Sequence, residues 1–406
     1  MDRVGGGLVA FLGAPGIGGP YRTGKALRDG LRPHGFTVRW LCLGPDAQAL
    51  IDRPEWAHER PFGSVLASDT RDERQQAVAL LDHLETVGYD IIIVNVLADR
   101  VQSSVVRHLD PRIRRIMIVH SITPGTYAAA RSIRDYVHAT VGVSPRISDD
   151  LVQRAGFAPE HTHVIGNPFD SEAFEGQERP AWDGPLRLLS LGRIEDASKG
   201  IFWLPSILRE LRDLPVTLTI AGDGPDDAKL RRLFAGQMDR VRFLGVIPPA
   251  GVARVMAEHD VFLLPSRFEG QSIALVEALA SGCVPVASHI RNVTDFVVEP
   301  GTGLLFPVGD IKAAAGLVRR LNGDRRLLTR MSVAARASAA ERFRTDRMAA
   351  AYAGVLERAM SHPRSIATPL PRSAWCLPAG LRPGLRSLLP SGVKNRVRLV
   401  MELLAL

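Results

Sequence analysis

The chain has 406 residues, which is too many for one ordinary hydrophobic core, so we expect two domains. Its 46% hydrophobic and 23% charged residues are typical of globular proteins, and no run approaches the ~18 apolar residues that a membrane-spanning helix needs. Of the net charge of +8, residues 361–406 carry +6, because they hold seven arginines and lysines against Glu402. The remainder is nearly neutral, and we expect no nucleic-acid partner.

The three cysteines, Cys42, Cys283 and Cys376, are few and far apart. They form neither a zinc pattern nor a disulfide framework, which favours a reducing compartment. The first eight residues lack the long apolar core of a signal peptide. We therefore expect a cytoplasmic protein, with attachment to the inner face of the membrane as an alternative that depends on the C-terminal segment.

Strands and helices alternate along both halves of the chain. Short apolar runs predict strands at 8–12, 37–41, 91–94, 116–119 and 139–143, and then at 186–191, 217–221, 241–244, 261–264 and 284–287. Continuous apolar strands separated by helices indicate parallel sheets that are covered on both faces. The predicted fold class is α/β, with two Rossmann-like doubly wound domains facing each other across a cleft.

The predicted domain boundaries follow from composition. Residues 171–185 are rich in proline, glycine and acidic side chains without periodicity, and are expected to be a linker. The first domain then covers 1–170 and the second 186–340, followed by a crossover helix at 341–360 and a basic tail at 361–406. Ligands of such sheets bind at the carboxyl ends of the strands, so loops from both domains should meet there.

The segment Pro265–Val286 carries two glutamates eight positions apart, Glu269 and Glu277. A buried strand ends in a polar loop, which opens a helix whose first N–H groups can bind an anion. Glu277 is expected about two turns into that helix, with Glu269 at its mouth. The arrangement suits a ligand with phosphates and hydroxyls. The alternative is one exposed glutamate beside an ordinary helical one.

Two further loops follow strands of the second half. Gly192–Gly200 places Arg193 and Lys199 where they could neutralise a diphosphate, with exposed loop charges as the alternative. Gly222-Asp-Gly-Pro225 has the composition of a tight turn, and could be no more than that.

The first half offers a glycine loop and a histidine. Gly19–Lys25 has the glycine and lysine spacing of a Walker A loop, but Ala26 replaces the magnesium-binding hydroxyl. A loop whose Gly18 and Gly19 approach a sugar diphosphate fits better. His120 follows a strand and could either bond a ligand hydroxyl or serve the core. No serine-triad or metallohydrolase pattern is present.

Taken together, these motifs resemble the retaining glycosyltransferases of the GT-B fold, the GT4-like group, also called glycosyltransferase group 1. The resemblance covers roughly residues 5–360. Its motifs are Gly18-Gly19, His120, Val164–Asp170, Gly192-Arg193, Lys199-Gly200, Gly222–Pro225, the pair Glu269 and Glu277, and the late helix Glu341–Tyr352.

The resemblance implies a role for each matching position. Arg193 and Lys199 would bind the donor diphosphate and act with His120 and Glu269 at the reacting centre. Glu277 would hold the ribose. The other donor contacts would be Gly18, Gly19, Gly245, Val246 and the backbone of Gly270, Gln271 and Ser272. Two departures stand out: the loop before Lys199 is long, and Gln271-Ser272 replaces the commoner Phe-Gly.

The implied reaction moves a sugar from a nucleoside-diphosphate sugar to an acceptor hydroxyl with retention, without a metal or other cofactor. The acceptor could be a saccharide, a lipid-linked glycan or a natural product. A sugar-nucleotide epimerase and a non-catalytic nucleotide-sugar binding protein are the alternatives. Residues 381–406 mix cations with apolar residues, so they could lie on an anionic membrane or dock on protein.

Overall fold

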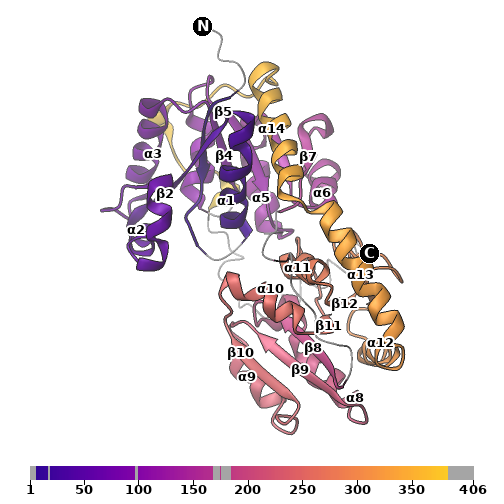
Figure 1. Ribbon diagram of the computed structural model, residues 1–406. Coiled ribbons are helices and arrows are strands. Elements are labelled where there is room, and N and C mark those ends of the chain that lie inside the picture. Colours follow the sequence, from indigo (N-terminus) through magenta and orange to yellow (C-terminus); the bar gives the residue numbers. More distant parts are fainter. Residues whose placement is uncertain (1–5, 17–18, 97–98, 168–173, 175–183, 383–406) are drawn as a thin grey trace. The chain divides into compact units, whose positions relative to one another are not determined.

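The computed structural model describes residues 6–16, 19–96, 99–167, 174 and 184–382 (Figure 1). The described residues fall into two compact units: residues 6–167 with 345–382, and residue 174 with 184–344. Each unit contains one parallel sheet and its own helices, which confirms the predicted α/β class with two doubly wound sheets. Most of the expected linker at 171–185 lies outside the described residues.

The sheet of the first unit has seven strands in the order β3-β2-β1-β4-β5-β6-β7. The strands are Leu8–Leu12 (β1), Thr37–Leu43 (β2), Gly63–Leu66 (β3), Ile91–Asn95 (β4), Arg114–Val119 (β5), Ala139–Gly142 (β6) and Thr162–Val164 (β7). The helices are Gly19–Leu31 (α1), Gly44–Ile51 (α2), Glu73–Val87 (α3), Arg100–Val105 (α4), Pro124–Ile133 (α5), Pro145–Ala155 (α6) and Thr345–Ser361 (α14).

The sheet of the second unit has six strands in the order β10-β9-β8-β11-β12-β13. The strands are Leu186–Leu191 (β8), Val216–Ala221 (β9), Val241–Gly245 (β10), Val261–Leu264 (β11), Val284–Ser288 (β12) and Leu304–Phe306 (β13). The helices are Asp196–Lys199 (α7), Leu204–Glu210 (α8), Asp227–Leu233 (α9), Pro249–Ala257 (α10), Ile273–Ser281 (α11), Ile311–Gly323 (α12) and Arg325–Arg342 (α13).

Strand β11 shows why an unbroken apolar run forms a central strand. Val261 and Leu263 pack in a core beneath α8 and α12, whereas Phe262 and Leu264 pack in a second core beneath α10, α11 and α13. Successive side chains point to opposite faces, so a strand that is covered on both faces must be apolar throughout. This central position places the loop after β11 in the middle of the sheet's carboxyl edge.

Most of the expected helix at 341–360 is α14, whereas its first two residues are the end of α13. Helix α13 ends at Arg342 in the second unit, and α14 begins at Thr345 in the first. Phe343 and Arg344 therefore separate them. Helix α14 packs closely on α1, where a Cβ added to Gly30 would lie 2.6 Å from the Cβ of Ala349. Glycine allows this close approach.

The chain continues along the first unit after α14. Trp375 is buried there, and its Nε1 donates to Ser104 Oγ at 3.0 Å. Part of the segment expected as a basic tail is thus ordered on the first unit, and residues 383–406 lie outside the described chain. Within the described residues, no helix has the length and apolarity to cross a bilayer.

Candidate functional site

A hollow of about 320 Å³, open to solvent, lies at the carboxyl ends of β8, β9 and β11 in the second unit. Its walls include the loop after β8, Ala221 at the end of β9, and Pro265 after β11. Arg193 and Lys199, the cations predicted to bind a diphosphate, both line it. This is the edge at which parallel α/β sheets bind their ligands.

The Gly222–Pro225 motif supports the wall of this hollow. A Cβ added to Gly222 would collide with the carbonyl oxygen of Gly192, and one added to Gly224 would collide with that of Ile194. The Ile194 N–H donates to the carbonyl of Asp223 at 2.6 Å. Both glycines have positive φ angles, 129° and 159°. The motif is therefore more than a turn, because it is the surface on which the Arg193 loop rests.

The long loop before Lys199 contains the four-residue helix α7, Asp196–Lys199. Gly200 ends this helix in the left-handed conformation, at φ 60°. A Cβ at Gly200 would collide with the carbonyl oxygen of Pro265. The extra residues of the loop thus form a helical turn that places Lys199 against the end of β11. The length of the loop therefore does not hold Lys199 away from the site.

Lys199 and Glu269 form an ion pair, with Nζ donating to Oε1 at 2.6 Å. Ser266 Oγ donates to the same oxygen at 2.6 Å, and Asn292 Nδ2 donates to the Glu269 carbonyl at 2.7 Å. Glu269 is 6% exposed. Three donors therefore hold a buried glutamate in place, and the ammonium of Lys199 stays at the wall of the hollow.

Arg267 ties the Glu269 loop to helix α7. Its NH2 contacts Asp196 Oδ2 at 2.9 Å, its Nε donates to the Asp196 carbonyl at 3.1 Å, and its backbone N–H donates to Ser198 at 2.8 Å. The guanidinium also stacks 3.8 Å from the ring centroid of Trp203. Arg267 thereby fixes the element that carries Lys199. Nothing in the sequence around Arg267 indicated this role, because its partners on α7 lie about 70 residues upstream.

Arg193 is arranged differently. Its side chain is 68% exposed, and it lies 4.0 Å from Glu195. An exposed pair at this distance contributes little stability. The structure brings Lys199 and Glu269 together but leaves the Arg193 guanidinium extended at the mouth of the hollow.

Helix α11 begins at Ile273, with the Ser272 hydroxyl accepting from the Leu275 N–H. Glu277 is consequently its fifth residue, little more than one turn from the start rather than the two turns expected. It is 4% exposed. Gly270 and Gln271 form the loop between Glu269 and this helix, so the predicted contact residues are contiguous.

The predicted base contacts lie at the end of β10. Gly245 has a φ of 68°, and its carbonyl accepts from the Gly222 N–H at 2.7 Å. Val246, the next residue, is 53% exposed. A bulky apolar side chain is thus presented to solvent beside the loop that supports Arg193.

His120 follows β5 in the first unit and belongs to a polar cluster at the strand ends. Its Nε2 lies 2.8 Å from Asn95 Oδ1, and Asn95 Nδ2 donates to the Leu12 carbonyl at 2.9 Å. Asn95 Oδ1 must therefore accept, and Nε2 carries the proton. Burial lowers the pKa of His120 to about 4, against an opposing contribution from Asn167. The ring is neutral at pH 7, which leaves Nδ1 as an acceptor.

The segment with Walker A spacing, Gly19–Lys25, is the start of helix α1 and not a loop. Gly19 is the first residue of α1, and Gly24 and Lys25 lie within that helix. This agrees with the rejection of a Walker A loop. Thr23, on the same helix, donates to Asn167 Oδ1 at 3.0 Å, so α1 contributes to the His120 cluster. Gly18 lies outside the described residues.

Two family models match the chain: "Glycosyltransferase Family 4" over residues 17–173 and "Glycosyl transferases group 1" over residues 185–324. Together they span most of it, and the chain belongs to this family of glycosyltransferases. The second match lies within the second unit, and the first match ends five residues beyond the change of unit at residue 168.

Among curated relatives, the amylovoran biosynthesis glycosyltransferase AmsK of Erwinia amylovora is 30% identical over 213 residues, which are 50% of this chain and 52% of AmsK. The phosphatidyl-myo-inositol mannosyltransferase of Mycobacterium leprae is 36% identical over 163 residues, 38% of this chain and 42% of the relative. The matches thus span about half the length of these relatives.

The solved structures extend the likeness in fold to nearly the whole chain. HepE of Anabaena, in complex with UDP and glucose, has a TM-score of 0.69 at 19% identity, covering 86% of this chain and 99% of HepE. The sucrose-phosphate synthase of Thermosynechococcus elongatus has a TM-score of 0.73 at 18% identity, covering 87% and 99%. The fold is therefore that of the GT-B glycosyltransferases.

Proposed function

We propose that the protein is a retaining glycosyltransferase that moves a sugar from a nucleoside-diphosphate sugar to an acceptor hydroxyl without a metal. The observation that carries the proposal is the ion pair of Lys199 with the buried Glu269, at the wall of a hollow that Arg193 also lines. Family membership and the UDP complex of HepE support a nucleotide-sugar donor.

In the proposed arrangement, the donor diphosphate lies against Lys199 and Arg193. Cations preorganised at a leaving group stabilise the charge that develops in the transition state, and each such interaction can contribute several kcal/mol. Glu269, already held by three donors, would bind a hydroxyl of the transferred sugar. Glu277 would hold the ribose, and Val246 would lie by the base.

The proposed reaction takes place on one face of the sugar. The bond between the anomeric carbon and the β-phosphate oxygen breaks through an oxocarbenium-like state. The acceptor oxygen forms its bond to the anomeric carbon on the same face, and its proton passes to the departing phosphate. The neutral His120 has a buried Nδ1 without a hydrogen-bond partner among the described residues, and we propose that it accepts from a ligand hydroxyl. No protein nucleophile is required.

The protein is proposed to act in the cytoplasm. All three cysteines are free thiols, with Cys42 and Cys283 buried and Cys376 exposed, which suits a reducing compartment. Contact of residues 381–406 with an anionic membrane stays a prediction, which flotation of full-length and truncated protein on anionic liposomes would test.

A thermal-shift panel of UDP, GDP, ADP and their sugar conjugates, in the presence of a chelator, tests the proposal. One base should raise the melting temperature by mass action, and Arg193→Ala and Glu277→Ala should abolish the shift. Release of nucleoside diphosphate that requires an added acceptor distinguishes transfer from epimerisation or plain binding. The absence of any shift would contradict the donor site.

A further inference from the structure

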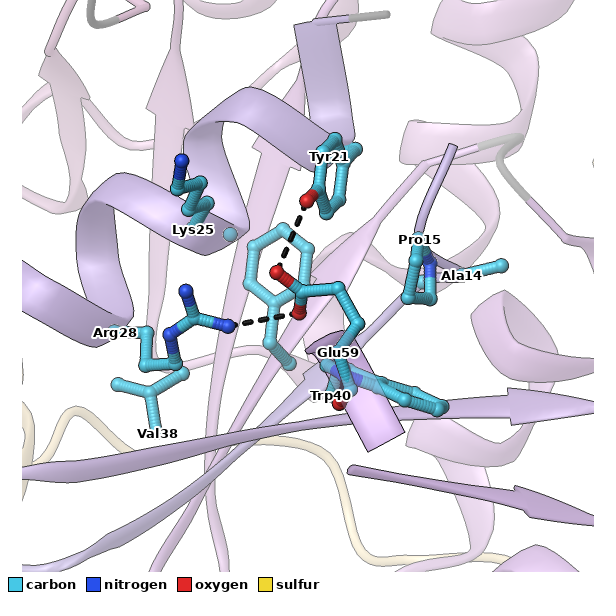
Figure 2. Close-up of a pocket in the computed structure, with 11 residues that line it drawn as sticks. Ala14, Pro15, Tyr21, Lys25, Arg28, Val38, Trp40 and Glu59 are labelled. Carbon is cyan, nitrogen blue, oxygen red and sulfur yellow. Dashed lines mark hydrogen bonds and ion pairs between the residues drawn. The ribbon is translucent and has the colours of Figure 1, made fainter. Parts of the chain in front are cut away.

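A second hollow, open to solvent and of about 300 Å³, lies in the first unit between α1 and the strands β1 and β2 (Figure 2). Tyr21, Gly24, Lys25 and Arg28 line it from α1, where spacings of three and four residues place them on one helix face. The other lining residues are Phe11, Gly13, Ala14, Pro15, Val38, Trp40 and Glu59.

The hollow contains a buried carboxylate that has a donor on each of its oxygens. Glu59 is 1% exposed; its Oε1 accepts from the Tyr21 hydroxyl at 3.0 Å and its Oε2 from Arg28 NH1 at 2.7 Å (Figure 2). Burial, with Glu59 next in importance, raises the pKa of Tyr21, so its hydroxyl stays a donor. Arg28 also donates from Nε to the exposed Asp29 at 3.0 Å, so this network builds the wall from one cation and two carboxylates.

Lys25 is the cation on this wall that takes no part in the network. It is exposed, and among the residues that the structure describes no ion pair of Lys25 is found. The other walls are largely apolar, with the rings of Phe11 and Trp40 and the side chains of Pro15 and Val38. The hollow thus combines an apolar body with one ammonium group that forms no ion pair among the described residues.

The hollow adjoins the His120 cluster through shared backbone. Gly13, on its wall, follows Leu12, whose carbonyl accepts from Asn95. On α1, Thr23 belongs to the His120 cluster while its neighbour Gly24 lines the hollow. A Cβ added to Gly13 would lie 3.4 Å from Asn95 Nδ2, so the wall of the hollow borders the side chain that bonds His120.

We propose that this hollow binds the acceptor, and that the acceptor is a small aromatic compound carrying an acidic group as well as its hydroxyl. The ring would pack against Phe11 and Trp40, and the acid would pair with Lys25. A saccharide fits less well, because its hydroxyls would lose water against apolar walls whose carboxylate already has its donors. The claim that the bound molecule is a glycosyl acceptor rests on the proposed function. The claim that the hollow binds an aromatic acid does not rest on it.

Calorimetry on the full chain tests this with a matched pair of probes, 6-hydroxy-2-naphthoate and the neutral 2,6-dihydroxynaphthalene. The acid should bind at least tenfold more tightly. Lys25→Gln should remove that preference and leave the affinity for the neutral probe unchanged. Lys312→Gln, the same change at an exposed lysine on α12 of the other unit, is the matched control and should behave as wild type.

Equal binding of the two probes, absence of binding, or an unchanged preference in Lys25→Gln would overturn the inference. The thermal-shift panel run on the same samples separates the two proposals. Nucleotide binding without a charge-dependent preference for the acid contradicts the acceptor site alone. Probe selectivity without any nucleotide shift contradicts the transferase and leaves an aromatic-acid site.

Discussion

The two sheets carry different kinds of polar group at their carboxyl ends. In the second unit, Lys199 and buried Glu269 form a charged pair beside a hollow, and Arg193 extends to solvent. In the first unit, neutral His120 and Asn95 form a chain of hydrogen bonds that ends on a backbone carbonyl. The comparison suggests a division of labour, with one edge suited to a diphosphate and the other to an uncharged hydroxyl.

The largest effect on activity is expected from removal of the Lys199 ammonium at the charged edge of the second unit. Lys199→Ala should lower turnover at least about a thousandfold, because the leaving diphosphate loses a preorganised cation. Lys312→Ala is the matched control. Steady-state release of nucleoside diphosphate measures the effect. Turnover within tenfold of wild type would show that the charged pair serves the fold rather than the reaction.

The next largest effect is expected at the Gly222–Pro225 motif, on which the Arg193 loop rests. Gly222→Ala should lower the free energy of unfolding by about 3 kcal/mol, because the added Cβ collides with Gly192 and the residue has a φ of 129°. Gly236→Ala, where the added Cβ meets nothing within 4 Å, should change it by less than about 0.5 kcal/mol. Urea unfolding measures both, and equal stabilities would contradict this account of the glycine.

Arg267 sharpens the comparison by separating position from charge. Arg267→Ala should weaken nucleoside-diphosphate binding about tenfold, since α7 loses its tie to the Glu269 loop. Arg267→Lys should restore part of the affinity. Arg254→Ala, at a side chain that is 74% exposed, should have no effect. If calorimetry finds unchanged affinity while stability falls, Arg267 is structural only.

The neutral edge of the first unit is expected to show its effect in the pH dependence of stability. The pKa of His120 is about 4 in the folded protein, against an ordinary value of 6.5. The unfolded chain therefore binds the proton first, and folding loses stability as pH falls from 6.5 towards 4. Between pH 7 and pH 5 the wild type should lose on the order of 2 kcal/mol more than His120→Gln. Parallel urea titrations with no such difference would contradict a buried neutral ring.

The sequence predicted long central strands but missed three short ones. Strands β3, β7 and β13 have three or four residues and lie at sheet edges. Edge strands need no continuous apolar run; Val164 of β7, for example, is 52% exposed. A pattern based on burial on both faces therefore finds the central strands, and also β10, but not the other three edge strands.

The sequence predicted the site residues that lie in motifs. It did not predict the residues that hold these side chains in position. Lys199 and Glu269 were expected in one site, and the structure joins them. The bonds by which Arg267 ties the Glu269 loop to α7 were not expected, because they join segments that are far apart in the sequence. Glu59 likewise lies in a 3₁₀ segment, Pro54–Phe62, without periodicity. Only the spacing of Tyr21, Lys25 and Arg28 could have indicated a lined helix face.

The central claim is that Arg193 and Lys199 together bind the diphosphate of a nucleotide. Calorimetry with a nucleoside diphosphate and the monophosphate of the same base tests it most directly. The account predicts at least tenfold tighter binding of the diphosphate, with the preference lost in both Arg193→Gln and Lys199→Gln. Equal affinities in the wild type, or a preference that survives in both variants, would contradict it.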